Sequence, residues 1–562
     1  MKLPLAFTEK MKRLLGEEYG DWLATYDNER RYGLRVNTLK VRPDRFLELT
    51  GMAELAPVPW AEGGFTYKEE ERPGRHPHYH AGLYYIQEPS AMVPAELLDA
   101  RPGDRVLDLC AAPGGKSTQL AAKLQGQGLL VANDNAAERT KALARNIELA
   151  GVRNAVVLNE EPARLAGPFN GFFTKILVDA PCSGEGMFRK DESMIAQWEK
   201  HSVERCSLLQ RDILRHAADM LAPGGTLVYS TCTFSPEENE TQIASLLRER
   251  PELAVEPVAL RHGWVAGRPD WTGADPGEPA SAAVAGTVRL WPHLTAGEGH
   301  YAAVIRHTGP MGVPSEAAGD TPGKRAGELI DGTNRAVGAS GREPSGPARS
   351  GGRGEDAARG KAAERKDKDR SIAASARERA ARQTERLKRT EGPRGGRREG
   401  AASDMPAPDP EGQWRRFAAA QLVCEPEKWP GRTVAFGSRV YLQPEDIPPL
   451  DGLRVVRAGW YLGEASAHRF EPSQALAMGL TAADAARSLR LAANEPDTAR
   501  YLRGDTLAVD AGRLTGPDGS ALEAGTAKGW VLMLIDGFPA GWGKWDGGML
   551  KNGLAPGWRR MG

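Results

Sequence analysis

The sequence predicts an α/β protein organised around a parallel sheet, and three observations support this fold class. Between residues 86 and 308, short β-branched runs alternate with helical stretches, which is the pattern of successive βα units. A glycine-rich loop follows the first of these runs. Cysteines follow two of the later runs, at the ends of predicted strands where open α/β sheets place their ligands.

Composition divides the chain into four regions. Residues 1–85 have mixed composition and predict a small α+β domain, and residues 86–308 form the parallel-sheet domain. Residues 309–413 contain no Phe, Trp or Tyr, so they cannot bury enough surface to offset their conformational entropy, and we expect a disordered linker. Residues 414–562 are globular in composition and hold seven of the 13 Trp of the chain.

The charges of the chain are unevenly distributed, although its formal net charge is zero. Residues 321–400 hold 21 Lys and Arg against 12 Asp and Glu, and the rest of the chain is mildly acidic. Such a basic segment either contacts nucleic-acid phosphates or serves as a flexible spacer.

Several classes of protein are disfavoured by simple features. The first ten residues lack the apolar run of a signal peptide, and we find no stretch of about 18 apolar residues that would predict a membrane span. The five cysteines form no C-x-x-C pair, so we expect neither a metal site nor a disulfide framework. A cytoplasmic protein with free thiols fits these features.

The glycine loop, DLCAAPGGKS at 108–117, lies between a predicted strand and a helical stretch that starts at Thr118. Glycines let a ligand approach the backbone, and the helix N-terminus offers free N–H groups. A phosphate-binding loop would need glycine at position 110, which is Cys110, and the dinucleotide pattern G-x-G-x-x-G is absent. The next strand ends at Asp134, a carboxylate suited to ribose hydroxyls. The loop and this acid therefore fit several nucleotide cofactors.

Two cysteines stand just beyond the predicted fourth and fifth strands. Cys182 follows the strand that ends at Asp179, and Cys232 follows the strand that ends at Ser230. A thiolate at such a position could act as a covalent nucleophile, and the residues alone do not choose between the two. Ser235 and Glu238 resemble a capping box, which would open a helix and leave Cys232 on a short turn. The remaining cysteines are expected to be inert: Cys110, Cys206 and Cys424.

Three motifs, DLCAAPGGKS (108–117), DAPCSGEG (179–186) and STCTFSPEEN (230–239), resemble the Sun/NSUN family of RNA cytosine-5 methyltransferases in order and spacing. Segments near both ends of the chain extend the resemblance to the bacterial RsmF-type branch, which acts on 16S ribosomal RNA. It implies a Rossmann-like S-adenosylmethionine-dependent methyltransferase domain at 86–308, an N-terminal RNA-recognition domain at 1–85, and a mostly β, PUA-like RNA-binding domain within 414–562.

The resemblance also implies a covalent mechanism. Cys232 would be the nucleophile that attacks carbon-6 of the cytosine, Cys182 would assist the release of the carbon-5 proton that precedes elimination of the thiol, and Asp179 would lie beside both the cofactor and the base. Carbon-5 then becomes enamine-like and can accept a methyl group from the sulfonium. The target base must leave its stack to reach these groups.

The residues expected to bind S-adenosyl-L-methionine follow from the same motifs. Asp134 would hold the ribose, and Asp179 would contact the cofactor. A Glu after the third strand would lie near the adenine; Glu161 matches by spacing, and Glu160 is its adjacent alternative. The loop residues implied are Cys110, Ala111, Ala112, Pro113, Gly114, Gly115 and Lys116.

The expected partner is ribosomal RNA or the small ribosomal subunit, bound by a monomer. About half of the C-terminal Trp residues are expected in the core, whereas Trp542 and Trp545 are candidates for a surface that stacks RNA bases. Two other functions compete with cytosine methylation. A non-catalytic assembly factor would not need two thiols at strand ends, and methylation of an amine usually needs no covalent cysteine.

Overall fold

A ten-stranded mixed sheet forms the centre of the methyltransferase-like region, in the order β11-β12-β13-β9-β8-β5-β6-β7-β16, with β10 paired to β13. The strands β9, β8, β5, β6 and β7 run parallel, as the alternation of strand and helix predicts. The parallel strands are β5 (Arg105–Asp108), β6 (Leu129–Asn133), β7 (Ala155–Leu158), β8 (Phe173–Asp179) and β9 (Leu221–Thr231). The antiparallel edge strands are β10 (Leu253–Val255), β11 (Val265–Ala266), β12 (Val288–Leu290) and β13 (His300–His307).

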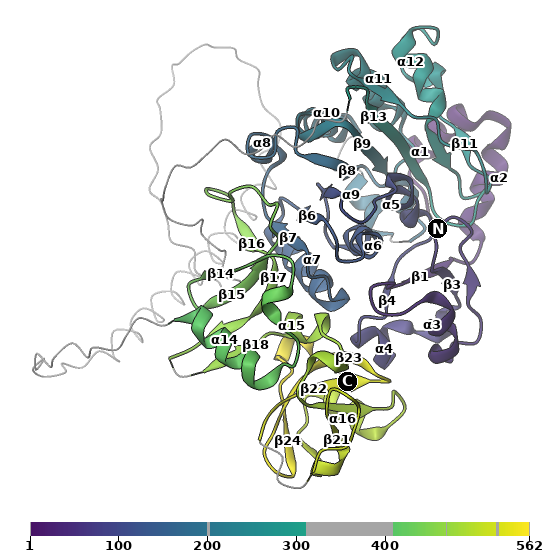
Figure 1. Ribbon diagram of the computed structural model, residues 1–562. Helices are drawn as coiled ribbons and strands as arrows, with labels where there is room; N and C mark the ends of the chain where they lie inside the picture. Colours follow the sequence, from purple (N-terminus) through teal and green to yellow (C-terminus); the bar gives the residue numbers. More distant parts are fainter. Residues whose placement is uncertain are drawn as a thin grey trace, which may run out of the picture. The chain divides into compact units, whose positions relative to one another are not determined.

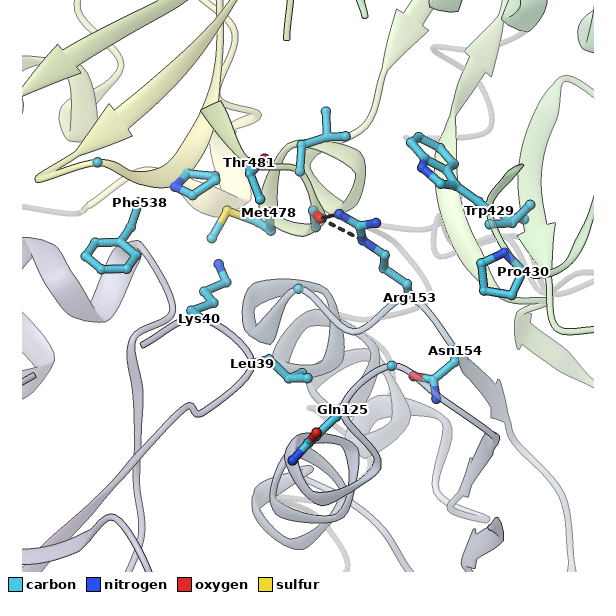
Figure 2. A pocket seen from close by; sticks show the side chains of 17 residues that line it. Leu39, Lys40, Gln125, Arg153, Asn154, Trp429, Pro430, Met478, Thr481 and Phe538 are labelled. Carbon is cyan, nitrogen blue, oxygen red and sulfur yellow. Dashed lines mark hydrogen bonds between the residues drawn. The ribbon is translucent and has the colours of Figure 1, made fainter. Parts of the chain in front are cut away.

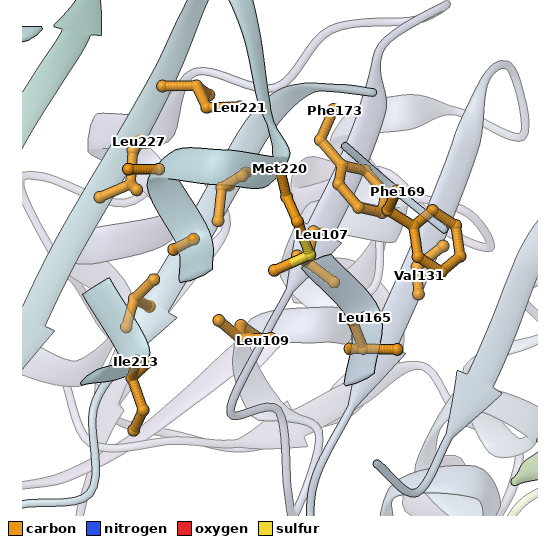
Figure 3. Close-up of a cluster of buried hydrophobic side chains, with 14 of the residues drawn as sticks. Leu107, Leu109, Val131, Leu165, Phe169, Phe173, Ile213, Met220, Leu221 and Leu227 are labelled. Atoms are coloured by element: carbon orange, nitrogen blue, oxygen red, sulfur yellow. The ribbon is translucent and has the colours of Figure 1, made fainter. Parts of the chain in front are cut away.

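Helices cover both faces of this sheet. Val106 joins an apolar cluster with α5 (Val93–Leu98), α6 (Gly115–Leu124) and α7 (Ala137–Ala150). The next residue, Leu107, points to the other face and packs with α8, α10 and α11 (Figure 3). These helices are α8 (Pro162–Ala166), α10 (Val203–Met220) and α11 (Glu240–Glu249); α9 (Ser193–Trp198) and α12 (Pro279–Ala283) complete the region. Each fully buried Leu or Val stabilises the fold by about 1.5–3 kcal/mol, so these clusters fix the strands that carry the site.

The pairing of β8 with β9 brings the two cysteine motifs together. Asp179, the last residue of β8, is the ladder partner of Ser230 in β9. Cys182 and Cys232 follow these partners by three and two residues. Because parallel strands end at the same edge of a sheet, both motifs emerge side by side.

The N-terminal region is a four-stranded antiparallel sheet in the order β2-β3-β1-β4, with short helices. Its residues share one apolar cluster with strands of the last region of the chain, so the two ends of the chain pack together. The elements are α1 (Leu5–Leu15), α2 (Tyr19–Ala24), β1 (Tyr32–Val36), α3 (Pro43–Thr50), β2 (Ala56–Pro57), β3 (Gly64–Tyr67), α4 (Pro77–His80) and β4 (Tyr84–Ile86).

The C-terminal region is mostly β and contains two sheets of its own. The first has the order β14-β15-β17-β18, and the second β20-β24-β23-β22-β19-β21. The first half of the region comprises the strands of the first sheet and three further elements: α14 (Pro410–Gln421), β14 (Arg432–Phe436), β15 (Arg439–Gln443), β16 (Val455–Arg457), β17 (Trp460–Ala465), β18 (Phe470–Pro472) and α15 (Gln474–Gly479). The second comprises β19 (Ser488–Leu491), α16 (Pro496–Arg503), β20 (Leu507–Ala508), β21 (Leu514–Thr515), β22 (Gly529–Ile535), β23 (Phe538–Trp545) and β24 (Met549–Asn552).

One strand of the C-terminal region belongs to the central sheet. β16 pairs antiparallel with β7, with Val455 opposite Leu158, and Figure 1 shows the two strands side by side. Beside them, the carboxylate of Glu160 accepts from the backbone N–H of Arg454 at 2.7 Å and from its guanidinium at 3.1 Å. The sequence patterns of 86–308 gave no sign that a distant segment completes the sheet.

The expectation that Trp542 and Trp545 form an RNA-stacking surface is wrong. They are only 2% and 4% exposed, and their indole N–H groups donate to the backbone carbonyls of Ser473 and Val509, each at 2.8 Å. The reason is that β23 lies inside its sheet, with Trp542 in the apolar cluster on one face and Trp545 in the cluster on the other.

The structure is a computed structural model, and it describes residues 2–190, 192–198, 203–310, 409–467, 469–523 and 528–560. The predicted linker, 309–413, lies outside the described residues except for its ends, where α14 begins at Pro410. The described residues before 311 and after 408 belong to one compact unit. Within the described ranges, no helix is both long and apolar enough to cross a membrane.

Candidate active site

The glycine loop forms the turn between β5 and α6. Gly114 adopts a φ of 110°, a conformation that side-chain-bearing residues rarely adopt, and α6 begins at the next residue. The first N–H groups of the helix lack partners within it, so they are available to a ligand. The Ser117 hydroxyl donates to the Asp108 carboxylate at 2.6 Å, which locks the loop to the end of the strand.

Asp108 is a residue of this loop that the sequence patterns did not single out. Its carboxyl is fully buried, its Oδ1 has no partner among the described residues, and burial raises its pKa from 3.8 to about 7. The folded protein therefore binds one more proton than the unfolded chain between about pH 4 and 7, and this contribution to stability is lost as the pH rises through that window.

We expect Asp108→Asn to remove this pH dependence. Between pH 5 and pH 8, the wild type should lose roughly 3 kcal/mol of stability relative to the variant, because one pKa unit corresponds to about 1.4 kcal/mol. Urea unfolding of both proteins at the two pH values measures the difference. Curves for the two proteins that shift in parallel with pH would contradict this assignment.

Asp134 follows β6 and ties two loops together. Its side chain is 3% exposed and accepts from the backbone N–H of Ala112 at 3.2 Å and of Ala136 at 2.9 Å. Arg139 lies 3.5 Å from the same carboxylate and donates to the carbonyl of Ala112. The structure thus brings Asp134 against the glycine loop, which is the contact that a shared cofactor site requires.

The structure separates the two glutamates that follow β7. The Glu160 side chain is fully buried and is engaged by Arg454 and by Arg164 at 3.3 Å. Glu161 is exposed, and both of its carboxylate oxygens lie 3.3 Å from the amide of Asn135, the residue after Asp134. Of the two glutamates, Glu160 is thus buried in ion pairs, whereas Glu161 is exposed.

The two cysteines lie in direct contact. The Sγ atoms of Cys182 and Cys232 are 3.4 Å apart, and both residues are half-buried. The hydrogen bond to Cys232, together with burial, raises the pKa of the Cys182 thiol well above its ordinary value. Cys182 is thus held as a protonated thiol next to the sulfur of Cys232.

Cys110, by contrast, packs against the apolar cluster beneath the sheet, and burial raises the pKa of its thiol. The structure therefore agrees with an inert Cys110 side chain whose contribution to a site comes from its backbone.

Asp179 lies beside the cysteines as part of an ion pair. The Lys116 ammonium donates to its Oδ2 at 2.6 Å, and the Ser230 hydroxyl donates to its Oδ1 at 2.8 Å. Burial alone would raise the pKa of Asp179, but Lys116 and His300 hold it below its ordinary value. The carboxyl is therefore ionised, which suits stabilisation of positive charge rather than donation of a proton.

The predicted capping box after Cys232 is wrong. Ser235 precedes only a single 3-10 turn (Pro236–Glu238), makes no cap hydrogen bond, and instead donates to Glu185 at 3.1 Å. The Glu238 carboxylate accepts from the backbone N–H of Ser183 at 2.9 Å. Both side chains reach across to the Cys182 loop, so they tie the two cysteine loops together.

A cavity lies away from these groups. It has a volume of about 490 Å³ and is lined by residues that include Lys40, Arg153, Met478 and Phe538 (Figure 2). The Arg153 guanidinium donates to the carbonyl of Gly479 and lies 4.7 Å from the centre of the Trp460 ring. None of the predicted site residues lines this cavity.

Comparison with known proteins identifies four successive segments. Residues 95–306 match the family described as 16S rRNA methyltransferase RsmB/F, and residues 3–89 match the N-terminal domain of 16S rRNA methyltransferase RsmF. Residues 416–480 match the first C-terminal domain of RsmF rRNA methyltransferase, and residues 488–560 match the RsmF PUA domain. The predicted fold class, with a Rossmann-like domain, a small N-terminal domain and a PUA-like C-terminal domain, is confirmed.

Individual relatives agree with this assignment. The chain is 39% identical over 315 residues to ribosomal RNA small subunit methyltransferase F of Vibrio campbellii, an alignment that covers 54% of this chain and 63% of that protein. It is 35% identical to the protein of the same name from Cronobacter sakazakii, over 57% of this chain and 67% of that protein. For Vibrio vulnificus the identity is 43%, over 42% of this chain and 52% of the relative.

Among solved structures, a methyltransferase homologue from Pyrococcus horikoshii is 30% identical with a TM-score of 0.46, over 54% of this chain and 94% of the other. The alignments with the three curated relatives span between about half and about two thirds of the length of those proteins. The four matched segments, together with the relative from Cronobacter sakazakii, show that the chain belongs to the RsmF family of 16S rRNA methyltransferases.

Proposed function

We propose that this chain methylates carbon-5 of a cytosine in 16S ribosomal RNA, with S-adenosyl-L-methionine as the methyl donor and a covalent bond between Cys232 and the base. The observation that carries the proposal is the pair of thiols 3.4 Å apart at the ends of adjacent strands, beside an ionised Asp179. Binding alone would not need this arrangement, and neither would methylation of an amine.

The residues around the glycine loop fit this cofactor. The free N–H groups at the start of α6 suit a carboxylate, and the acidic side chains of Asp134, Glu161 and Asp179 suit ribose hydroxyls, an adenine amine and an ammonium. Lys116 holds Asp179 at 2.6 Å and so fixes its orientation between the loop and the cysteines. When bound there, S-adenosylmethionine would supply an electrophilic methyl group.

The chain's own groups account for the remaining steps. The Cys232 thiolate forms a bond to carbon-6 of the cytosine, and the electron pair displaced toward carbon-5 makes that carbon nucleophilic. The ring nitrogen takes up a proton from solvent as this bond forms, the ionised Asp179 stabilises that proton, and the proton returns to solvent when the base is released. After carbon-5 is methylated, its proton passes to solvent, the pair of electrons left behind re-forms the double bond between carbon-5 and carbon-6, and the sulfur–carbon bond breaks with its electron pair returning to the Cys232 sulfur. The protonated Cys182 stabilises the departing thiolate by donating a hydrogen bond to it.

The proposal predicts a defined product. Incubating the protein with small-subunit RNA, or with small subunits, and labelled S-adenosylmethionine should place label in the RNA. Bisulfite sequencing should then identify 5-methylcytosine at defined positions. Label in base amines instead of carbon-5 would favour amine methylation, and RNA binding without transfer would favour the assembly factor. We further infer that the protein works as a cytoplasmic monomer.

A further inference from the structure

His300 stands beside the two cysteine loops, although no role was predicted for it from the sequence. It is the first residue of β13, and its neighbour Tyr301 is the ladder partner of Thr231, the residue before Cys232. The backbone links are direct: Gly299 N–H donates to the carbonyl of Gly186 at 3.4 Å, and Gly186 N–H donates to the carbonyl of Cys232 at 2.9 Å. A Cβ at Gly186 would lie 2.6 Å from the carbonyl oxygen of Gly299, so this close approach requires glycine.

The protonation of the His300 imidazole follows from its hydrogen-bond network. The Glu88 carboxylate accepts from the Ser90 hydroxyl, from the backbone N–H groups of Ser90 and Ala91 at 3.0 Å, and from that of Glu298 at 2.9 Å. Because the single hydroxyl proton of Ser90 goes to Glu88, the Ser90 oxygen accepts at His300, whose Nδ1 lies 3.2 Å away. A neutral imidazole that carries its proton on Nδ1 has a bare acceptor at Nε2.

That Nε2 acceptor is left without a partner. His300 is 5% exposed, and its Nε2 has no hydrogen bond among the described residues. Burial, together with the nearby ammonium groups of Lys116 and Lys190, lowers the pKa of His300 to about 4. The carboxylates of Asp179 and Glu88 act in the opposite direction. The ring is therefore neutral at physiological pH, so it is a reliable acceptor and a weak proton-abstracting base.

A buried acceptor without a partner is costly unless a ligand satisfies it. We propose that Nε2 of His300 accepts a hydrogen bond from the target nucleotide, through either the exocyclic amine of the cytosine or the 2′-hydroxyl of its ribose. These are the two donors of a neutral cytidine within an RNA chain. The inference rests on the proposed function, because it assumes that the target base reaches Cys232 and Asp179. Uracil presents an acceptor in place of the amine. If the amine is the donor, uracil could not donate to Nε2 of His300, and the two acceptors would repel each other.

Paired substitutions of His300 and of the target nucleotide test the proposal. After the methylated cytosine is mapped, three RNAs are compared: the natural RNA, one with 2-pyrimidinone at the target, which lacks the amine, and one with 2′-deoxycytidine there. For the wild type, kcat/KM should fall by about 10- to 100-fold with the RNA that lacks the true donor, beyond any intrinsic difference in reactivity. His300→Asn lacks an acceptor at the Nε2 position, so its kcat/KM with the natural RNA should fall by about the same factor. This variant should no longer discriminate against the RNA that lacks the true donor.

His300→Gln is the matched variant, since its amide oxygen reaches the position of Nε2 and should keep part of the discrimination. His307→Asn, at the other end of β13, is the control and should behave as wild type. If His300→Asn lowers kcat/KM equally for all three RNAs, or leaves it unchanged, the inference is wrong. If the wild type forms no 5-methylcytosine in natural RNA, the proposed function fails instead.

Discussion

Replacing Cys232 by Ala should abolish methyl transfer to RNA. The proposed reaction begins with a bond from this sulfur to carbon-6, and without it carbon-5 of cytosine is too weak a nucleophile to be methylated. Loss of a covalent nucleophile elsewhere costs several orders of magnitude, so we expect a fall of at least about 10⁴-fold. Single-turnover transfer of labelled methyl groups to small-subunit RNA measures the loss.

The matched controls are Cys206→Ala and Cys424→Ala, which remove half-buried free thiols that belong to none of the three motifs. Both should retain wild-type transfer. Normal activity in Cys232→Ala would refute the mechanism. A thermal unfolding midpoint close to the wild type separates loss of chemistry from loss of fold.

Replacing Cys182 by Ala should stall the reaction after attack. Its thiol lies 3.4 Å from the Cys232 sulfur and is held protonated, so its removal takes away the donor that stabilises the departing thiolate. The variant should accumulate a covalent RNA–protein adduct that survives denaturing electrophoresis, while turnover falls by about 10²-fold or more.

Adduct formation should depend on Cys232, so Cys182→Ala combined with Cys232→Ala should show none. Cys182→Ser, which keeps a hydroxyl donor, should turn over faster than Cys182→Ala and accumulate less adduct. If Cys232→Ala traps the adduct and Cys182→Ala does not, the roles of the two cysteines are reversed.

The sequence predicted those parts of the structure that follow from strand patterns and from the topology of a parallel sheet. The runs that end at Asp179 and Ser230 predicted two strands, and a parallel sheet necessarily brings their ends to one edge, where the structure places the cysteines in contact. The ionisation state of the Asp179 carboxyl could not be predicted, because it depends on burial and on the ammonium of Lys116, 63 positions away in sequence.

Other features depend on contacts that sequence spacing does not encode. Ser235 and Glu238 have capping-box spacing, but the Cys182 loop lies within reach and takes their hydrogen bonds. The sequence predicted no role for His300, because the ladder register of β13 with β9, which brings it to the cysteine loops, is not encoded in local spacing. The choice between Glu160 and Glu161 required the partner Arg454 from the C-terminal region.

The C-terminal origin of β16 limits how the protein can be divided. A chain cut after β13 would leave one edge of β7 with unpaired N–H and C=O groups, which is a template for association with other strands. The same cut would remove Arg454 and leave the fully buried Glu160 with Arg164 as its remaining ion-pair partner. We therefore expect that the methyltransferase domain does not fold autonomously: residues 86–308 produced alone should aggregate, and adding the C-terminal region as a separate polypeptide should restore a soluble complex.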